Sequence, residues 1–344
     1  MEIWERSLEN SITSPEELSG LFRVAAAPLS GVVRRYPMRI TPYYLSLITG
    51  PGDAIWRQCV PDPAELEDFT QSPDPLDEER LSPVPGLIHR YPDRVVLVVS
   101  SACAVYCRFC MRKRGVGCNG ILAASQEEAI GYIASRPEIR DVILSGGDPL
   151  LLPDDRLDDL LSALRKIPHV EIVRIGTRVP VTLPERITPR LVRMLKRHHP
   201  LFVNTHFNHP SEITAQSAKA CARLADVGIP LGNQTVLLKG VNDDPMVMRR
   251  LMQLLLTIRV RPYYIHQMDL VRGTAHFRTP VNHGVAVLDA LRGHTSGMAI
   301  PHYVIDLPGG KGKVEVAPGR VERNGSRLSI TNYLGETVEY LDVK

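Results

Sequence analysis

From residue 94 onward, short apolar runs rich in β-branched residues alternate with amphipathic helical segments. Six such runs occur, at residues 94–99, 141–146, 171–177, 201–207, 230–238 and 261–267. Strands that alternate with helices predict a parallel sheet with right-handed crossovers, and the near-continuous apolar character of several runs fits strands buried on both faces. Six β/α units are too few for a standard eight-unit barrel. We therefore expect an α/β fold whose sheet forms an open, partial barrel of about six parallel units.

The regions on either side of this alternation have a different character. Residues 1–60 have a helical pattern, with a capping box predicted at Ser14 and Glu17, and an acidic, proline-rich connector follows. After about residue 300 the pattern becomes one of short strands, the last two forming a hairpin with Gly335 in the turn. We therefore predict an N-terminal helical extension and connector over 1–85, a partial barrel over 86–298 and a C-terminal β segment over 299–344.

Composition excludes several classes of protein. The formal net charge of the 344 residues is only +3, so nothing points to nucleic acid or an anionic membrane as the partner. No apolar run approaches the roughly 20 residues of a membrane span, and the acidic N-terminus lacks the order of a secretory signal. We expect a soluble cytoplasmic protein. Six cysteines, three of them clustered, suggest metal ligands or catalytic groups rather than a disulfide framework.

Polar residues lie where the predicted strands end. Functional groups of parallel β/α folds gather at the C-terminal ends of the strands, so the shared position is a stronger signal than any single residue. The candidates in chain order are Cys103, Cys107, Cys110, Gly146, Gly147, Asp148, Arg178, His206, Gln234 and Asp269.

The three cysteines occupy one short segment, "CAVYCRFC" at residues 103–110. A structural zinc site usually needs four ligands, often as two pairs; Cys118 is near enough to be a fourth, but no second pair exists. Three thiolates on an iron–sulfur cluster leave one iron free for a substrate or cofactor. The spacing, with Phe109 directly before the third cysteine, resembles the radical S-adenosylmethionine (SAM) enzymes. That resemblance implies a [4Fe-4S] cluster held by Cys103, Cys107 and Cys110, with SAM on the open iron; the alternative is a structural zinc or a chance cluster.

The stretch "SGGDP" follows the second predicted strand. Gly146, Gly147 and Asp148 resemble the glycine-rich stretch that meets the SAM amino group in these enzymes, and glycine lets a backbone approach a ligand closely. The same residues are also ordinary turn chemistry.

Two further segments suggest a second cofactor. A lysine in the glycine-rich "PGGKGK" could grip a phosphate, lie in solvent, or form an imine with pyridoxal phosphate (PLP). Before the first strand, "HRYPDR" offers Arg90, Tyr91 and Arg94, and arginine forks suit phosphate oxygens. From these residues alone, all three roles of the lysine remain open.

Taken together, the segments resemble the lysine 2,3-aminomutase family of radical SAM, PLP-dependent isomerases. The resemblance runs from about Pro75 to Tyr340 and includes "CAVYCRFCMRKR", "ILSGGDPL", "LGNQTVLLKGVND", "RPYYIHQMDL" and "PGGKGK". It implies that Lys313 is the PLP lysine, with Lys311 as the neighbouring alternative. It also implies PLP phosphate contacts by Arg90, Tyr91 and Arg94, and positions near SAM for His206 and Gln234, each of which could instead be a satisfied buried polar side chain.

The same resemblance implies that an amino group moves from C2 to C3 of L-lysine to give β-lysine. Arg112 matches the arginine that holds the substrate carboxylate, and Asp269 and Asp306 match the aspartates that hold the side-chain ammonium. Two carboxylates offset the desolvation of an ammonium and would repel a glutamate side chain. The plainer alternative makes both aspartates loop or turn residues. To Lys113 and Arg114 we assign a structural or solvated role.

The chain departs from the longer family members at two points. They carry a zinc site with a cysteine after "VND", where this chain has Asp244, and no cysteine follows Cys221. We therefore predict a short form without that structural zinc and with a different oligomer interface. His266 stands where the longer enzymes tend to have tyrosine. It resembles the branch that makes β-lysine for elongation factor P, whereas "DLPGGKGK" is closer to the free-lysine enzymes. Arginine, a modified lysine or glutamate therefore stay open as substrates.

A reading from another class makes the chain an iron–sulfur electron-transfer protein or redox sensor, which has no use for an imine-forming lysine. For the enzyme we expect a small-molecule amino acid substrate and an electron donor such as flavodoxin or ferredoxin. We expect no nucleic acid or membrane partner, and the chain could form a homo-oligomer.

Overall fold

A 9-stranded sheet in the order β1 to β9 forms the centre of the computed structural model, which describes residues 2–117, 126–324 and 327–341. Strands β2 to β8 are parallel, whereas β1 and β9 pair antiparallel at the two edges. The strands are β1 Leu87–Tyr91, β2 Arg94–Ser100, β3 Asp141–Gly146, β4 Ile172–Gly176, β5 Leu201–Thr205, β6 Leu231–Leu237, β7 Arg261–Gln267, β8 His302–Asp306 and β9 Lys313–Glu315.

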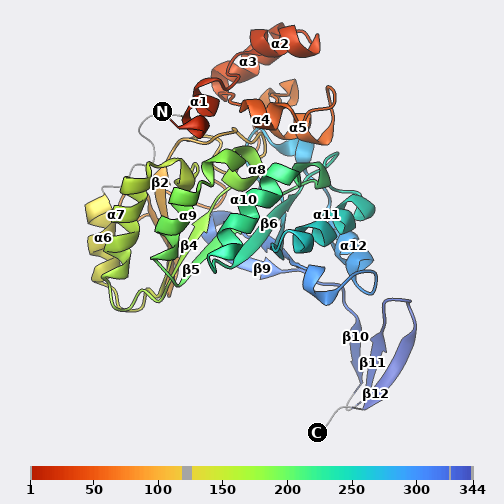
Figure 1. Cartoon of the computed structure of the whole chain (residues 1–344). Coiled ribbons are helices and arrows are strands. Elements are labelled where there is room, and N and C mark those ends of the chain that lie inside the picture. Colours follow the sequence, from red (N-terminus) through yellow and green to blue (C-terminus); the bar gives the residue numbers. More distant parts are fainter. Residues whose placement is uncertain (1, 118–125, 325–326, 342–344) are drawn as a thin grey trace.

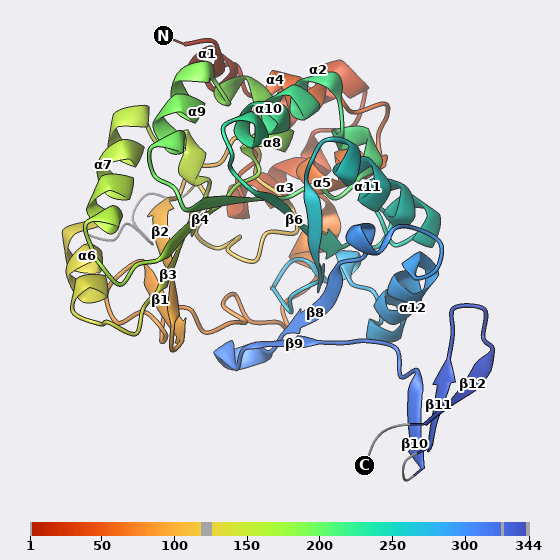
Figure 2. The same cartoon turned by 60° about the horizontal axis from the view of Figure 1, so that its bottom comes forward.

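The sheet curves into an open arc with helices on its outer side (Figure 2). These helices are α6 Gln126–Ala134, α7 Asp154–Arg165, α8 Val179–Thr182, α9 Pro189–Lys196, α10 Ala215–Asp226, α11 Pro245–Thr257 and α12 Val281–Leu291. Alternate strand residues such as Val142, Leu144 and Val173 are completely buried in the core. Their neighbours, such as Ile143 and Arg174, line a cavity. The expectation of strands buried on both faces was therefore wrong, because the inner face borders space that a ligand can fill.

The expected open β/α barrel is confirmed, and the six predicted strands correspond to β2 to β7. The barrel contains one more parallel strand than expected, β8, which pairs with β7 through Ile265 and Tyr303. Its return strand β9 places Lys313 opposite Asp306. The first part of the predicted C-terminal β segment therefore completes the barrel, and the exact domain boundaries stay a prediction.

The N-terminal helices lie over one end of the barrel (Figure 1). They are α1 Ile3–Glu9, α2 Pro15–Phe22, α3 Ala27–Arg35, α4 Pro42–Leu45 and α5 Ala54–Cys59. The capping box predicted at Ser14 and Glu17 is present. Backbone bonds join this layer to the cysteine loop, from Tyr106 N to the Arg39 carbonyl at 3.0 Å and from Arg108 N to the Gln58 carbonyl at 2.9 Å.

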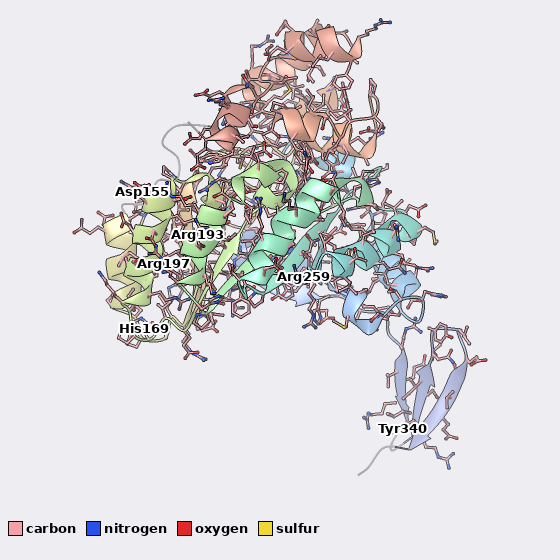
Figure 3. The ribbon with its side chains drawn as sticks, in the orientation of Figure 1. Asp155, His169, Arg193, Arg197, Arg259 and Tyr340 are labelled. Carbon is pink, nitrogen blue, oxygen red and sulfur yellow. The ribbon has the colours of Figure 1, made fainter. Side chains whose placement is uncertain are left out.

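A second sheet of β10 Val321–Asn324, β11 Arg327–Thr331 and β12 Thr337–Leu341 projects away from the barrel (Figures 1 and 2). β11 and β12 form the predicted hairpin, with Gly335 at φ +84° in the connection. Tyr340 stands on this sheet, far from the barrel (Figure 3). No helix in the described part of the chain combines the length and the apolar character needed to cross a membrane.

Candidate active site

A cavity of about 820 Å³ lies inside the arc of the sheet. Its lining brings together residues from the connector, the cysteine loop and both edges of the barrel. The predicted site residues that line it are Arg90, Tyr91, Arg94, Arg112, Gln234, Asp306 and Lys313. The resemblance to a family assigned these residues to two cofactors and a substrate, and the fold places them around one space.

Cys103, Cys107 and Cys110 lie in the loop that follows β2, with a turn bond of 3.2 Å from Cys110 N to the Cys107 carbonyl. Burial and the neighbouring thiols raise the pKa of Cys103 well above its usual value and that of Cys110 to about 11. Among the described residues, no three histidine, cysteine or acidic side chains converge on a single metal ion. Cys118, the other candidate ligand, lies outside the described residues.

The glycine-rich stretch after β3 is packed against the cysteine loop. A Cβ atom on Gly146 would lie 2.3 Å from the Ser100 carbonyl oxygen, and one on Gly147 would lie 2.3 Å from that of Ala102. Backbone bonds run from Gly147 N to the Ser100 carbonyl at 2.5 Å and from Asp148 N to the Ala102 carbonyl at 2.7 Å. The glycines are therefore needed for this close contact between backbones, whatever they do for SAM.

The side chain of Asp148, in the loop after β3, bonds to the loop that follows β4. It accepts hydrogen bonds from Thr177 Oγ1 at 2.6 Å and from Arg178 N at 2.7 Å. Burial raises the pKa of Asp148 to about 6. The cofactor contacts assigned to Gly146, Gly147 and Asp148 stay a prediction, but their role in ordering the cysteine loop follows directly from these bonds.

Arg178 was noted in the sequence only for its position after a strand. Its Nη1 donates to Cys107 Sγ at 2.8 Å, while Nη2 donates to Glu212 at 2.7 Å and to Gln58 at 2.5 Å. The side chain is almost completely buried, so a fixed positive charge stands against one of the cysteine sulfurs. No sequence motif identifies this contact, because its members come from four separate segments.

His206 directly follows β5, beside Phe109 of the cysteine loop, and Gln234 lies on the neighbouring strand β6. The His206 ring is 5.5 Å from that of Phe109, and its Nε2 lies 3.1 Å from Asn208 Oδ1. Burial and the charge of Arg178 hold the pKa of His206 well below its usual range, so the ring is neutral. Their contacts with SAM stay a prediction.

Lys313 faces the cavity at the opposite edge of the sheet. Its Nζ is 3.0 Å from Asp306 Oδ2 and 3.4 Å from His266 Nδ1, and its backbone N donates to the Tyr91 hydroxyl at 2.9 Å. Lys311, by contrast, is exposed. The geometry therefore favours Lys313 over Lys311 as the functional lysine.

The loop "PGG" before Lys313 shows why glycine is required there. Gly309 and Gly310 have φ values of +71° and +69°, a region that side chains disfavour. A Cβ atom on Gly310 would lie 2.7 Å from the Leu76 carbonyl oxygen, and Gly309 N donates to the Pro75 carbonyl at 2.8 Å. The acidic connector thus holds the loop that turns Lys313 back towards the cavity.

The predicted phosphate-binding residues surround Lys313. Arg90 Nη1 is 3.1 Å from Asp306 Oδ1, and the Arg94 guanidinium lies 3.9 Å from the centre of the Tyr91 ring. Arg90 Nε is buried and has no hydrogen-bond partner among the described residues. A buried, unpaired guanidinium donor fits an anionic oxygen such as that of a phosphate.

Asp269 and Asp306 differ sharply in their charge state. Burial and the charge of Asp306 raise the pKa of Asp269 to about 7. Burial would also raise the pKa of Asp306, but the hydrogen bond from His266 and the charge of Lys313 outweigh it and hold that pKa below its usual range. Near neutral pH, Asp306 is therefore ionised and Asp269 is poised between its two forms.

Arg112 is held by a residue that the sequence did not reveal. Its Nε and Nη2 donate to the carboxylate of Glu78 at 2.9 and 2.7 Å, and Nη1 donates to Ser145 Oγ at 3.1 Å. Arg112, Glu78 and Ser145 all line the cavity. Glu78 belongs to the connector, and only the folded chain brings it to Arg112.

The next two residues of the basic run have structural roles, as predicted. Lys113 Nζ is buried and lies 2.5 Å from Glu65 Oε2, which also pairs with Arg108 at 2.6 Å. Arg114 pairs with Asp74 at 3.0 Å. Asp244, at the position of the missing zinc ligand, instead caps α11.

The fold and the cysteine loop define a radical SAM protein, and the family model for the radical SAM superfamily matches residues 97–251. A second model, described as lysine-2,3-aminomutase, matches residues 288–342. The chain is 49% identical to L-lysine 2,3-aminomutase of Clostridium subterminale, over 98% of this chain and 83% of that protein. It therefore belongs to the lysine 2,3-aminomutase family, whose members are isomerases.

Other relatives of similar identity include both lysine and glutamate 2,3-aminomutases. L-lysine 2,3-aminomutase of Methanococcus maripaludis is 49% identical over 97% of this chain and 80% of its own length. Glutamate 2,3-aminomutase of Clostridioides difficile is 46% identical over 93% of this chain and 77% of its own length. A solved radical SAM methyltransferase from Sphaerobacter thermophilus aligns with 64% of this chain and 68% of its own at a TM-score of 0.45 and 16% identity.

Proposed function

We propose that this enzyme moves the amino group of L-lysine from C2 to C3 to give β-lysine, with a [4Fe-4S] cluster, SAM and PLP as cofactors. The observation that carries the proposal is the polarity of one cavity. Arg112 supplies a cation on one wall, and Asp306 supplies a carboxylate beside Lys313 on another. A molecule with a carboxylate at one end and an ammonium at the other matches that arrangement.

The described residues fit the three cofactors. Cys103, Cys107 and Cys110 form one loop beside the strand ends, and Arg178 stands against one of the sulfurs. Lys313 faces the cavity and shares Asp306 with Arg90, whose Nε has no hydrogen-bond partner among the described residues. When bound, the cluster and SAM supply a radical that removes hydrogen, and PLP supplies a carbonyl carbon and a ring that delocalises unpaired spin.

The residues of the chain bind and orient the substrate. Arg112 binds the α-carboxylate through the part of its guanidinium that Glu78 leaves free, and Glu78 keeps the fork in place. Asp306 and Asp269 bind the side-chain ammonium, which draws Asp269 to its ionised form. Binding at both ends fixes the carbon between them, and such positioning is a large part of catalysis.

Substrate choice follows from the acidic pair. Placing the second carboxylate of glutamate beside Asp306 and Asp269 brings like charges together in a buried place, which is costly. Lysine is therefore favoured over glutamate, although a glutamate 2,3-aminomutase is among the relatives. Arginine and a modified lysine are the other cationic candidates, and modification of elongation factor P is the alternative use of the β-lysine.

The test is anaerobic turnover of single amino acids. The reconstituted enzyme is incubated with SAM, a reductant and lysine, arginine or glutamate in turn, and the β-isomers are identified by mass spectrometry. We expect β-lysine. Turnover of glutamate without turnover of lysine would contradict the assignment of Asp269 and Asp306.

The same proposal includes an electron donor such as flavodoxin or ferredoxin, because a cluster that cleaves SAM must receive one electron for each activation. It also includes a cytoplasmic location and a homo-oligomeric state. Reduction by purified flavodoxin, followed by electron paramagnetic resonance, tests the first of these, and light scattering tests the last.

A further inference from the structure

His266 is the residue of the cavity whose role the function above leaves unexplained. It lies on β7, lines the cavity, and places Nδ1 at 3.3 Å from Asp306 Oδ2 and 3.4 Å from Lys313 Nζ. Its other ring nitrogen, Nε2, is buried and has no hydrogen-bond partner within the described part of the chain. A buried polar atom without a partner is destabilising, so the arrangement is one that a function would have to justify.

Two acceptors lie within reach of a proton on Lys313 Nζ. Asp306 is a weak base, because the hydrogen bond from His266 and the charge of Lys313 overcome the effect of burial and keep its pKa below the usual range. Burial and the charge of Lys313 also lower the pKa of His266, which leaves the ring neutral with a free electron pair. A neutral imidazole is the stronger base of the two.

We propose that His266 is the general base and acid that exchanges a proton with the Lys313 amine. In the forward direction one Nζ–H bond breaks and its electron pair stays on Nζ, while the electron pair of Nδ1 forms the new N–H bond. The imidazolium then donates Nδ1–H to Asp306 Oδ2. This inference rests on the proposed function, since Lys313 must be an uncharged amine to attack the PLP carbonyl.

The environment of His266 suits this exchange. The groups that face it are Asp306 on β8, Lys313 on β9, Tyr264 on its own strand with ring centres 5.4 Å apart, and His206 after β5. Because no group in the described part of the chain bonds to Nε2, the neutral ring can carry its proton on either nitrogen. The Nδ1–H tautomer donates to Asp306, whereas the Nε2–H tautomer leaves the Nδ1 electron pair free to accept from Lys313.

The test is the rate at which PLP attaches to Lys313, followed by visible absorption after PLP is mixed with the PLP-free, cluster-containing protein at several pH values. His266→Gln should slow attachment by about 10²–10⁴-fold, the usual contribution of a general base. It should also abolish the loss of rate that protonation of His266 causes in acid. The matched control is His302→Gln, a cavity histidine on the next strand that pairs with Glu315 at 3.0 Å; it should leave the rate unchanged.

A second variant separates proton transfer from positioning. In His266→Ala, added imidazole should restore part of the rate, whereas it should have no effect on the wild-type chain. Wild-type rates and pH dependence in His266→Gln, or slow attachment in His266→Ala that imidazole does not restore, would overturn the inference.

Two remaining outcomes are also decisive. If neither variant folds, as judged by circular dichroism, the wild-type protein alone provides the test. A rate of PLP attachment that does not fall in acid would then overturn the inference. If the wild-type chain attaches no PLP at Lys313, the proposed function itself fails, which is a different result from normal attachment in the His266 variants.

Discussion

The two ends of the site, the cysteine loop and the lysine edge of the cavity, hold their charged side chains in different ways. At the cysteine end the charged side chains are buried and form ion pairs with other buried side chains of the protein. Examples are Arg178 with Glu212 and Lys113 with Glu65. At the lysine end, Lys313, Asp306 and Arg90 pair mainly with one another and border open space.

This difference matches what each end has to do. A cluster is bound once and kept, so its loop gains from fixed partners and from backbone contacts as close as those at Gly147. A substrate binds and leaves in every turnover, and a covalently held cofactor changes its bonds to the protein. The residues that bind them must therefore be able to change partners. Charged groups that pair with one another can do so without leaving a buried charge alone.

The largest expected effect separates the two ends completely. Lys313→Ala should abolish covalent binding of PLP and leave the iron content unchanged, because its partners among the described residues, His266, Asp306 and Tyr91, lie on strands β7, β8 and β1 and not in the cysteine loop. Cys107→Ala should remove the cluster and leave PLP attachment intact. Iron analysis and visible spectra of both variants measure this, and loss of both cofactors in either variant would show that the ends are not independent.

The next effect compares one substitution at both ends. Arg178→Met leaves the buried Glu212 without its ion pair, which costs about 3–5 kcal/mol of unfolding free energy for a broken buried pair. Arg90→Met should cost far less, because Asp306 keeps Lys313 and His266 as partners. Urea unfolding of the two variants gives the comparison, and equal losses would contradict the proposed difference.

Asp269 gives a pH dependence at the lysine end. Its pKa is raised to about 7, so binding of an ammonium should weaken by about tenfold for each pH unit below that value. In the ligand-free protein, the effect of pH on folding stability through Asp269 has the opposite sign to its effect on ammonium binding. The folded state keeps a proton that the unfolded state has lost, so the contribution of Asp269 to stability falls as pH rises from about 4 to 7.

Asp269→Asn should remove both dependences. Calorimetric titration of lysine into the PLP-loaded protein and urea unfolding at pH 6 and pH 8 measure them. If the variant keeps the pH dependence of lysine binding, another group is responsible.

The smallest effect concerns the hydrogen bond from Lys313 N to the Tyr91 hydroxyl. Tyr91→Phe removes one acceptor and should cost about 0.5–1.5 kcal/mol of stability, with little loss of covalent PLP. Thermal unfolding with and without PLP measures it. A complete loss of PLP would mean that Tyr91 binds the cofactor far more strongly than a positioning role requires.

Much of the barrel and its cysteine loop could be predicted, because strand periodicity and cysteine spacing are local signals. The role of β8 could not, since "HYVID" carries no sign that it pairs with β7 rather than with later strands. Glu78 was missed and Arg178 was noted only for its position after a strand, because their partners Arg112 and Cys107 are distant in sequence. The pairing of Asp306 with Lys313 depends on the register of β8 and β9, which only the fold fixes.

The central claim is that Lys313 is the residue that carries the cofactor at the edge of this cavity. Borohydride reduction of the PLP-loaded protein, followed by proteolysis and mass spectrometry, tests it most directly. The account predicts a pyridoxyl group on Lys313 alone. A label on Lys311, or no labelled lysine at all, would contradict it.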